Sequence, residues 1–256
     1  MKHYKNYKTV LSAVALLLLS GTSMAQPVQN AATGPNKVYI EQVGNTNTVT
    51  IEQTGGTNSV GGVDNAVASN TNYATITGNS NIVSMIQKGD NNLGQYNIKG
   101  NNNEYTSNVT GNNNKTKLTV GDATNGNNLR NLVTETITGN DNTVIQNIIG
   151  SDIQSTLLIT GNLNEVTKDL KSNFGISDIT IAGGNNKLDI EQFDVSGANG
   201  HRLKQVITGD FNSIITQQQG TNDTTIDIKT TGDHNTITVR TSSASTIATP
   251  RTAVAR

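Results

Sequence analysis

Apolar and polar residues alternate along short segments of this chain. After Asn47, the residues Val49 and Ile51 are apolar, while Thr48 and Thr50 are polar. The same two apolar positions return after later asparagines as Val83 and Met85, Leu188 and Ile190, and Ile237 and Val239. Because neighbouring side chains of a strand lie on opposite faces of a sheet, this alternation predicts strands with one buried side and one solvent-facing side.

The alternation has exceptions. Glycine or a polar residue stands at four nominally inward positions, which are Gly94, Ser107, Gln146 and Lys168. After residue 223 the pattern shifts by one residue, so that Ile226 and Ile228 become the expected inward pair.

Glycines separate these segments at a nearly fixed spacing. Between Gly78 and Asn114, four Gly-x-x-Asn units follow one another every eleven residues. Glycine and asparagine tolerate left-handed backbone angles, so each unit is predicted to be a turn, and the segment between two turns has the length of one strand. The predicted turn glycines are Gly44, Gly55, Gly78, Gly89, Gly100, Gly111, Gly139, Gly150, Gly161, Gly183, Gly209, Gly220 and Gly232.

Some intervals between turn glycines are longer. The interval from Gly55 to Gly78 is interpreted as two units plus one residue. The intervals that begin at Gly111 and Gly183 are longer still, which leaves room for two units plus insertions near residues 123–128 and 196–200.

The even spacing of inward positions determines the predicted architecture. An asparagine, the two apolar residues after it and the glutamine that follows share one face of a strand. Two units make a 22-residue rung, so the sequence predicts an all-β chain, a parallel two-sheet β-solenoid of about nine rungs and roughly 40 Å in length. Each inward amide would stack on its copy in the next rung and exchange hydrogen bonds with it. The residues predicted to form these amide ladders are Gln42, Asn47, Gln53, Asn58, Asn81, Gln87, Asn92, Asn103, Asn114, Asn142, Asn164, Asn186, Gln192, Asn212, Gln218 and Asn235.

The composition fits a repetitive β structure better than a compact globular domain. Hydrophobic residues make up 33% of the chain and aromatic residues 4%, which is lean for a globular core. Charged residues make up only 14%, unlike a charge-rich disordered chain. The absence of cysteine excludes disulfides and thiolate metal sites. The net charge of −1 gives no sign of a basic surface, so no nucleic acid partner is expected.

The first residues are typical of a secretory signal. Three lysines precede the apolar run 10–19, and the sequence Ser23-Met24-Ala25 supplies small residues at its first and third positions before a cleavage point. The run is too short to span a bilayer. The sequence therefore predicts export to the outside of the cell or to its surface, with no membrane span in the mature chain. The predicted segments are a signal peptide 1–25, an N-terminal linker 26–37, a solenoid 38–241 and an irregular tail 242–256.

One motif carries a resemblance to a known family. The spacing Gln-x4-Asn-x5-Gln, with glycine two residues after each glutamine, occurs at Gln42, Asn47 and Gln53. On this motif the chain resembles the curlin repeats of the curli family of secreted bacterial amyloid-fibre subunits, over about residues 36–240. The resemblance implies nucleated self-assembly into extracellular fibres, or fimbriae, that serve biofilm formation, adhesion or surface attachment. The implied partners are other copies of the chain, a homologous nucleator subunit and an outer-membrane secretion channel. In several units an aliphatic residue replaces the glutamine, namely Ile98, Val109, Val120 and Ile148.

Catalysis is not expected. Outside the leader the chain has only two histidines, His201 and His234, and His234 stands in a predicted turn. Asp189 and Glu191 on one strand could serve a glycan-acting β-helix enzyme, but no acid, base and nucleophile converge around them.

Metal binding is not expected either. Gly-Asp pairs at 89–90, 121–122, 209–210 and 232–233 suggest calcium turns, but calcium-binding solenoids repeat every nine residues rather than eleven. We therefore expect no cofactor and no metal.

Two further functions compete with a fibre. Thr-x-Thr pairs at 48–50, 75–77, 136–138 and 236–238 suggest an ice-binding face. Charged residues interrupt the corresponding outward positions, which disfavours ice binding; they are Lys115, Lys117, Glu165, Lys187 and Asp189. The other alternative is a non-polymerising solenoid of an adhesin, a phage or a cell surface. Such a monomer needs capped ends, whereas a fibre subunit leaves its edge strands open.

Overall fold

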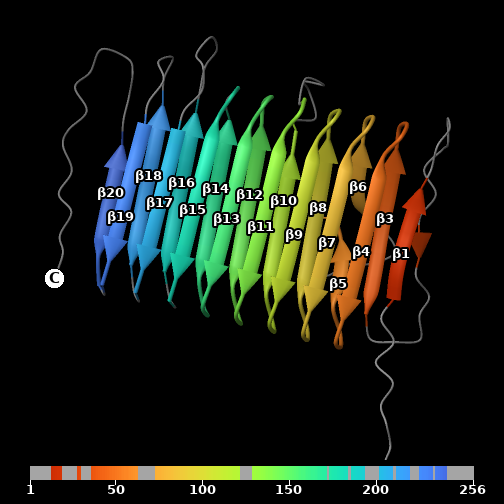
Figure 1. Cartoon of the computed structure of the whole chain (residues 1–256), viewed down its shortest axis with the longest axis horizontal. Helices are drawn as coiled ribbons and strands as arrows, with labels where there is room; N and C mark the ends of the chain where they lie inside the picture. The colour runs from red at the N-terminus through yellow and green to blue at the C-terminus, as the bar shows by residue number, and fades with distance from the viewer. Residues whose placement is uncertain are drawn as a thin grey trace, which may run out of the picture.

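The computed structural model describes residues 13–18, 28–29, 36–62, 73–121, 129–171, 173–183, 186–193, 202–209, 212–219, 225–232 and 234–240. These segments form two facing layers of strands stacked along one axis (Figure 1). They contain no helix, and so none long and apolar enough to cross a membrane.

The chain alternates between two sheets, which we call sheet A and sheet B. Sheet A contains, in spatial order, β1 (Ala13–Leu18), β4 (Thr48–Thr54), β7 (Ile82–Lys88), β9 (Glu104–Thr110), β11 (Leu132–Thr138), β13 (Gln154–Thr160), β15 (Ile176–Ala182), β17 (Arg202–Thr208) and β19 (Thr225–Thr231). Sheet B contains β2 (Val28–Gln29), β3 (Lys37–Val43), β5 (Ser59–Gly61), β6 (Ala74–Thr77), β8 (Leu93–Lys99), β10 (Lys115–Val120), β12 (Thr143–Ile149), β14 (Glu165–Lys171), β16 (Lys187–Phe193), β18 (Ser213–Gln219) and β20 (Thr236–Arg240). From β3 onward all pairings are parallel, which confirms the predicted two-sheet parallel β-solenoid.

Neighbouring parallel strands keep a constant register. Glu165 pairs with Lys187, which lies two units later in the sequence. Across the two longest intervals, Glu104 pairs with Leu132, and β15 pairs with β17 from its first residue to its last. These register steps equal the glycine intervals in the sequence, so extra residues do not disturb the strands. The two predicted insertions themselves lie outside the described residues.

The interval before Gly78 differs from the prediction. It holds one strand split into β5 and β6, because Val38 pairs with Val60 while Ile40 pairs with Ala74. The interpretation as two units plus one residue is therefore wrong, and the residues between β5 and β6 are an insertion within a single strand position. Glycines at the end of β5 weaken a strand, which explains why the break falls there. The described strands from β3 onward thus form eight complete rungs instead of the nine predicted, and the last layer contains only β20.

The core lies between the two sheets and follows the predicted alternation. Val49 and Ile51 are buried, and so are their counterparts Val83 and Met85. The shift predicted after residue 223 is confirmed, since Ile226 and Ile228 are the buried residues of β19.

The turns explain why glycine recurs so strictly. The first residue of the turn at Gly100 has a φ of 127°, and the third, Asn102, is left-handed with a φ of 56°. A Cβ at Gly78 would overlap the carbonyl oxygen of Gly100 in the next rung. All the predicted turn glycines have positive φ except Gly220, which lies outside the described residues.

Two strands at the N-terminal end break the parallel pattern. β1 pairs antiparallel with β4, and β2 pairs antiparallel with β3 (Figure 1). The segment 26–37, predicted to be a linker without a strand, therefore contributes β2. β1 falls within the predicted signal peptide, and the remainder of that peptide and the tail 242–256 lie outside the described residues.

Candidate functional site

The inward asparagines at the starts of the sheet B strands form one continuous series, which we call the long ladder. In the middle of the stack, Asn114 Nδ2 donates to Asn92 Oδ1 at 3.1 Å, and Asn142 Nδ2 donates to Asn114 Oδ1 at 3.0 Å. Asn114 Nδ2 also donates to the carbonyl oxygen of Gly139 at 2.8 Å. The long ladder comprises Asn36, Asn58, Asn92, Asn114, Asn142, Asn164, Asn186, Asn212 and Asn235.

The donor direction is the same in every step of the long ladder. In the bonds between ladder asparagines, each member donates to the one before it in the sequence and accepts from the one after it. Asn36, which the sequence did not predict as a member, accepts from the backbone N–H of Asn58 at 2.9 Å. The ladder therefore runs from the first strand of the solenoid, β3, to the last, β20.

A second series begins the sheet A strands and is shorter. Asn81 Nδ2 donates to Asn47 Oδ1 at 3.1 Å, and Asn103 Nδ2 donates to Asn81 Oδ1 at 3.0 Å. Asn131 continues it with a backbone bond to Asn103 Oδ1. The series then stops, because Ile153 takes the next position and offers only its backbone N–H to Asn131. The glycine spacing did not identify Asn131, because position 128, three residues earlier, holds asparagine instead of the usual turn glycine.

The glutamines stack less regularly than the asparagines. Gln53 Nε2 donates to Gln87 Oε1 at 2.8 Å, but Val109 lies in register beyond Gln87. Gln218 Nε2 donates instead to the backbone oxygen of Arg202 at 3.2 Å. Gln42 is buried, and its Nε2 has no partner among the described residues. The side chain of Gln192 lies outside the described part of the chain.

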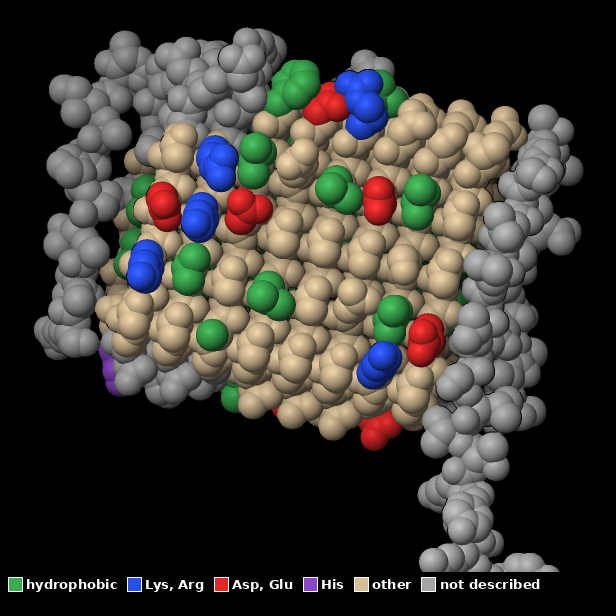
Figure 2. Space-filling view, in the orientation of Figure 1, with side chains coloured by type: hydrophobic (Ala, Val, Ile, Leu, Met, Phe, Trp, Pro, Cys, Tyr) green, Lys and Arg blue, Asp and Glu red, His purple; other side chains and the backbone are tan. Residues whose placement is uncertain are grey.

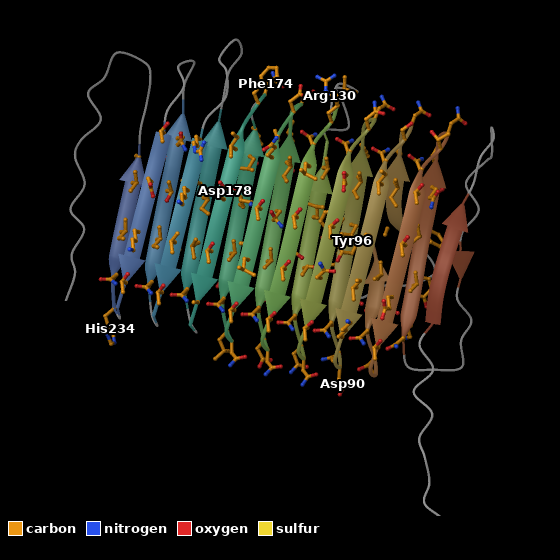
Figure 3. All side chains as sticks on the ribbon, in the orientation of Figure 1. Asp90, Tyr96, Arg130, Phe174, Asp178 and His234 are labelled. Carbon is orange, nitrogen blue, oxygen red and sulfur yellow. The ribbon has the colours of Figure 1, made fainter. Side chains whose placement is uncertain are left out.

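Polar side chains also bridge successive turns on the outside of the stack. The backbone N–H of Asn79 donates to Asn101 Oδ1 at 2.7 Å. Asp90, labelled in Figure 3, accepts in the same way from the N–H of Gly56 at 2.6 Å. Asp90 is the described acid of the four Gly-Asp pairs, and its carboxylate thus serves the turn. Among the described residues no group of acids and histidines is arranged to hold a metal.

A polar cluster interrupts the apolar core near the middle of the stack. Glu135 Oε1 accepts from Ser107 Oγ at 2.9 Å, and its Oε2 accepts from Gln146 Nε2 at 2.8 Å. Lys168 Nζ donates to Ser155 Oγ at 2.7 Å. These five residues, which we call the core cluster, are all buried. The alternation identified Ser107, Gln146 and Lys168 as exceptions, but it did not show that they meet around Glu135.

Burial shifts the acid–base properties of this cluster. Desolvation lowers the pKa of Lys168 to about 7, although the charges of Glu135 and Asp178 act against this shift. Desolvation raises the pKa of Glu135, while the hydrogen bonds from Ser107 and Gln146 and the charge of Lys168 oppose the rise. Each charge therefore partly offsets the cost of burying the other.

Two tyrosines pack beside the core cluster. The rings of Tyr96 and Tyr105 have centroids 5.3 Å apart, and Tyr96 Oη lies 3.0 Å from Thr116 Oγ1. Gly94 makes room for the first ring, because a Cβ there would lie 2.6 Å from Tyr96 Cε2. The exceptional glycine thus accompanies a larger inward side chain two residues later.

The two ends of the solenoid differ. Ile237 and Val239 in β20 are only half-buried, whereas Ile214 and Thr216, their register partners in β18, are completely buried. Among the described strands, β19 and β20 each pair on one side only. At the opposite end, β1 and β2 cover part of the edges of β4 and β3.

The candidates for enzyme chemistry lie apart from one another. His234 is exposed in a turn with a φ of 58°, and Figure 3 shows it projecting from the end of the stack. Asp189 and Glu191 lie on the outer side of β16. His201 lies outside the described residues.

Comparisons with known proteins give no relative. No family model, no curated protein and no solved structure matches the chain.

Proposed function

We propose that this chain is a structural subunit that stacks end to end into extracellular fibres, as the curlin-repeat proteins it resembles do. The observation that carries the proposal is the long ladder, which runs through all the sheet B layers and ends at an edge strand paired on one side. The inferred role is mechanical, in biofilm, adhesion or surface attachment.

The donor direction of the long ladder indicates that the next copy at its C-terminal end would contribute a hydrogen-bond donor. Asn235 Nδ2 donates to Asn212 Oδ1 at 3.0 Å, so Asn235 Oδ1 is the next acceptor in the series. At the other end, Gln42 Nε2 is a buried donor without a described partner. An unsatisfied buried donor costs roughly 1–3 kcal/mol, and a second copy stacked on that end could remove this cost.

The open edge of β20 offers main-chain pairing as well. A strand paired on one side exposes a row of N–H and C=O groups that can template another strand. Burying the half-exposed Ile237 and Val239 would add a hydrophobic contribution of about 1 kcal/mol or more for each side chain.

The N-terminal end fits the proposal once the leader is considered. Cleavage before Gln26, as the sequence predicts, would remove β1 and leave the edge of β4 uncovered. Only β2, which pairs at Tyr39 and Ile40, would still cover part of β3. Export would then produce a subunit with both ends available. The proposed partners are further copies, a homologous nucleator and an outer-membrane secretion channel, and not a nucleic acid.

Assembly of purified residues 26–256 tests the proposal. We expect thioflavin T fluorescence to rise after a lag, preformed seeds to abolish the lag, and electron microscopy to show fibres.

Val239→Lys should block elongation of seeds, because it places a charge at the open edge of β20. Ile215→Lys changes an exposed outward residue one strand away and should elongate normally.

The antiparallel strands β1 and β2 favour a second candidate, a non-polymerising surface solenoid with a capped end. A β-rich monomer that never polymerises, with or without seeds, would establish this candidate and reject the fibre. The long ladder would then serve only the stability of the monomer.

A further inference from the structure

The outer faces of the two sheets differ in where their charged residues lie. In sheet B, the strands β10, β14 and β16 carry Lys115, Lys117, Glu165, Lys187 and Asp189 on their outer side. These are the charged residues that disfavoured a regular threonine face in the sequence, and all of them lie on one sheet.

The middle of the sheet A face is neutral and rich in threonine. On β11 and β13 the outward residues are Leu132, Thr134, Thr136, Thr138, Gln154, Thr156, Leu158 and Thr160. Figure 2 views this face, and charged side chains gather toward its two ends while the centre has almost none. In register, Thr106, Thr134 and Thr156 form one line along the stack, and Thr110, Thr138 and Thr160 form another.

We propose that this face pairs with the same face of a second copy. The small, β-branched threonine side chains have few rotamers, and they repeat every strand on a sheet whose strands run nearly parallel (Figure 1). Two such faces can interdigitate as dry, regularly packed sheets about 10 Å apart. Lateral pairing does not depend on end-to-end stacking and can occur whether or not the chain forms fibres.

The size of the face suits a stable dimer. The parallel strands β4 to β19 of sheet A span about 35 Å at the usual strand spacing, and seven residues of each strand span about 20 Å. The product is roughly 700–800 Å² for each partner, which is the size of a standard specific interface.

One two-fold arrangement brings opposite charges together at both ends of the face. A two-fold axis parallel to the strands reverses the order of layers and keeps each residue's position along its strand. β4 then lies opposite β19, β7 opposite β17, β9 opposite β15, and β11 opposite β13. By register, Glu52 faces Lys229, Ile86 faces Val206, and Thr134 faces Thr156.

No charge in this arrangement lies directly opposite a like charge. Lys88 faces Thr208, Glu104 faces Ile176, and Asp178 faces Thr106. Because the interface is isologous, the Glu52–Lys229 contact occurs twice, once at each end. The neutral centre thus supplies close packing, and the two Glu52–Lys229 contacts favour this orientation.

Sedimentation and light scattering of the purified protein over a range of concentrations test the pairing. We expect a dimer, and T134K/T156K should shift it to monomer because four lysines would meet at the centre of the interface. The matched variant T143K/T167K places the same two lysines on sheet B and should remain dimeric. Circular dichroism verifies that all variants keep their β content.

Charge exchange tests the orientation. E52K should weaken dimerisation at least several-fold, K229E should do the same, and E52K/K229E should restore it. E191K, on the outer side of sheet B, is the control and should leave dimerisation unchanged. Absence of rescue would overturn the proposed arrangement.

Other results would contradict pairing through the sheet A face. A wild-type protein that stays monomeric at every concentration would overturn the proposal. If that monomer also caused thermal hysteresis of ice growth that T134K/T156K abolished, the threonine face would bind ordered water instead. A dimer unaffected by T134K/T156K but dissociated by T143K/T167K would place the interface on sheet B.

Discussion

The long ladder and the core cluster are two buried polar regions of the same solenoid that solve the desolvation problem differently. In the long ladder an identical residue recurs, and each Asn Oδ1 accepts from the next rung, as Asn92 does from Asn114. In the core cluster Glu135, Gln146 and Lys168 each occur once and need partners specific to them. The first region can be extended by adding another rung, and the second cannot.

Repetition of one residue is enough to satisfy buried amides. A buried amide without partners is costly, but stacking identical amides supplies every donor with an acceptor automatically. A buried charge has no such remedy, because stacking identical charges would be repulsive. The core cluster therefore occurs at only one position along the stack, while the long ladder can continue through any number of rungs.

The largest expected effect comes from breaking the core cluster. Glu135→Met removes the acceptor of Ser107 and Gln146 and the opposite charge that acts most strongly on Lys168. We expect a loss of about 4 kcal/mol in the free energy of unfolding, since Ser107 and Gln146 lose their buried acceptor and Lys168 loses its counter-charge. Equilibrium unfolding in urea measures this loss.

The matched control for this prediction is Glu191→Met on the outer side of β16. It should change the free energy of unfolding by less than about 0.5 kcal/mol, as surface substitutions usually do. Equal effects of the two variants would show that Glu135 contributes no more than a surface carboxylate.

The second prediction breaks the long ladder in its middle. Asn114→Ala removes the bonds to Asn92 and Gly139 and leaves the N–H groups of Asn142 without their acceptor. We expect a loss of about 3 kcal/mol, because several buried groups become unsatisfied at once. Thr119→Ala, on the outer side of β10, is the control in urea unfolding. A loss of under about 1 kcal/mol for Asn114→Ala would contradict the stacking account.

The sequence predicted the ladder better than the cluster for a physical reason. Repeated residues such as Asn92 and Asn114 reveal the rung length and, through strand alternation, the inward direction of their side chains. The partners of Glu135 and Lys168 lie on different strands at different positions, so no periodicity in the chain brings them together. The spacing of the glycines also hid the split between β5 and β6, because the interval from Gly55 to Gly78 so closely resembles two units.

The third prediction uses pH to separate the two regions. The folded pKa of Lys168 is about 7 and lies below its unfolded value, so the unfolded state binds more protons between these two values. The free energy of unfolding should therefore rise by about 2 kcal/mol between pH 7 and pH 9, relative to Lys168→Met.

The raised folded pKa of Glu135 has the opposite effect on stability, and its contribution is lost as pH rises from the unfolded pKa through the folded one. Unfolding scans of both proteins across pH measure these differences, and the amides of the long ladder should contribute nothing to them. Parallel curves for the two proteins would show that Lys168 titrates normally.

The smallest effect is expected where the long ladder ends. Asn235 donates to Asn212 but, as the last member, has no described asparagine above it, so Asn235→Ala leaves fewer groups unsatisfied than Asn114→Ala. We expect a loss of about 1 kcal/mol or less in the monomer, because one neutral hydrogen bond contributes about that much.

In assembled fibres Asn235 would become an interior member of the long ladder, and its substitution should then cost as much as Asn114→Ala. Urea depolymerisation of fibres, compared with urea unfolding of the monomer, measures both values for each variant. Equal costs of Asn235→Ala in monomer and fibre would mean that copies do not join through the long ladder.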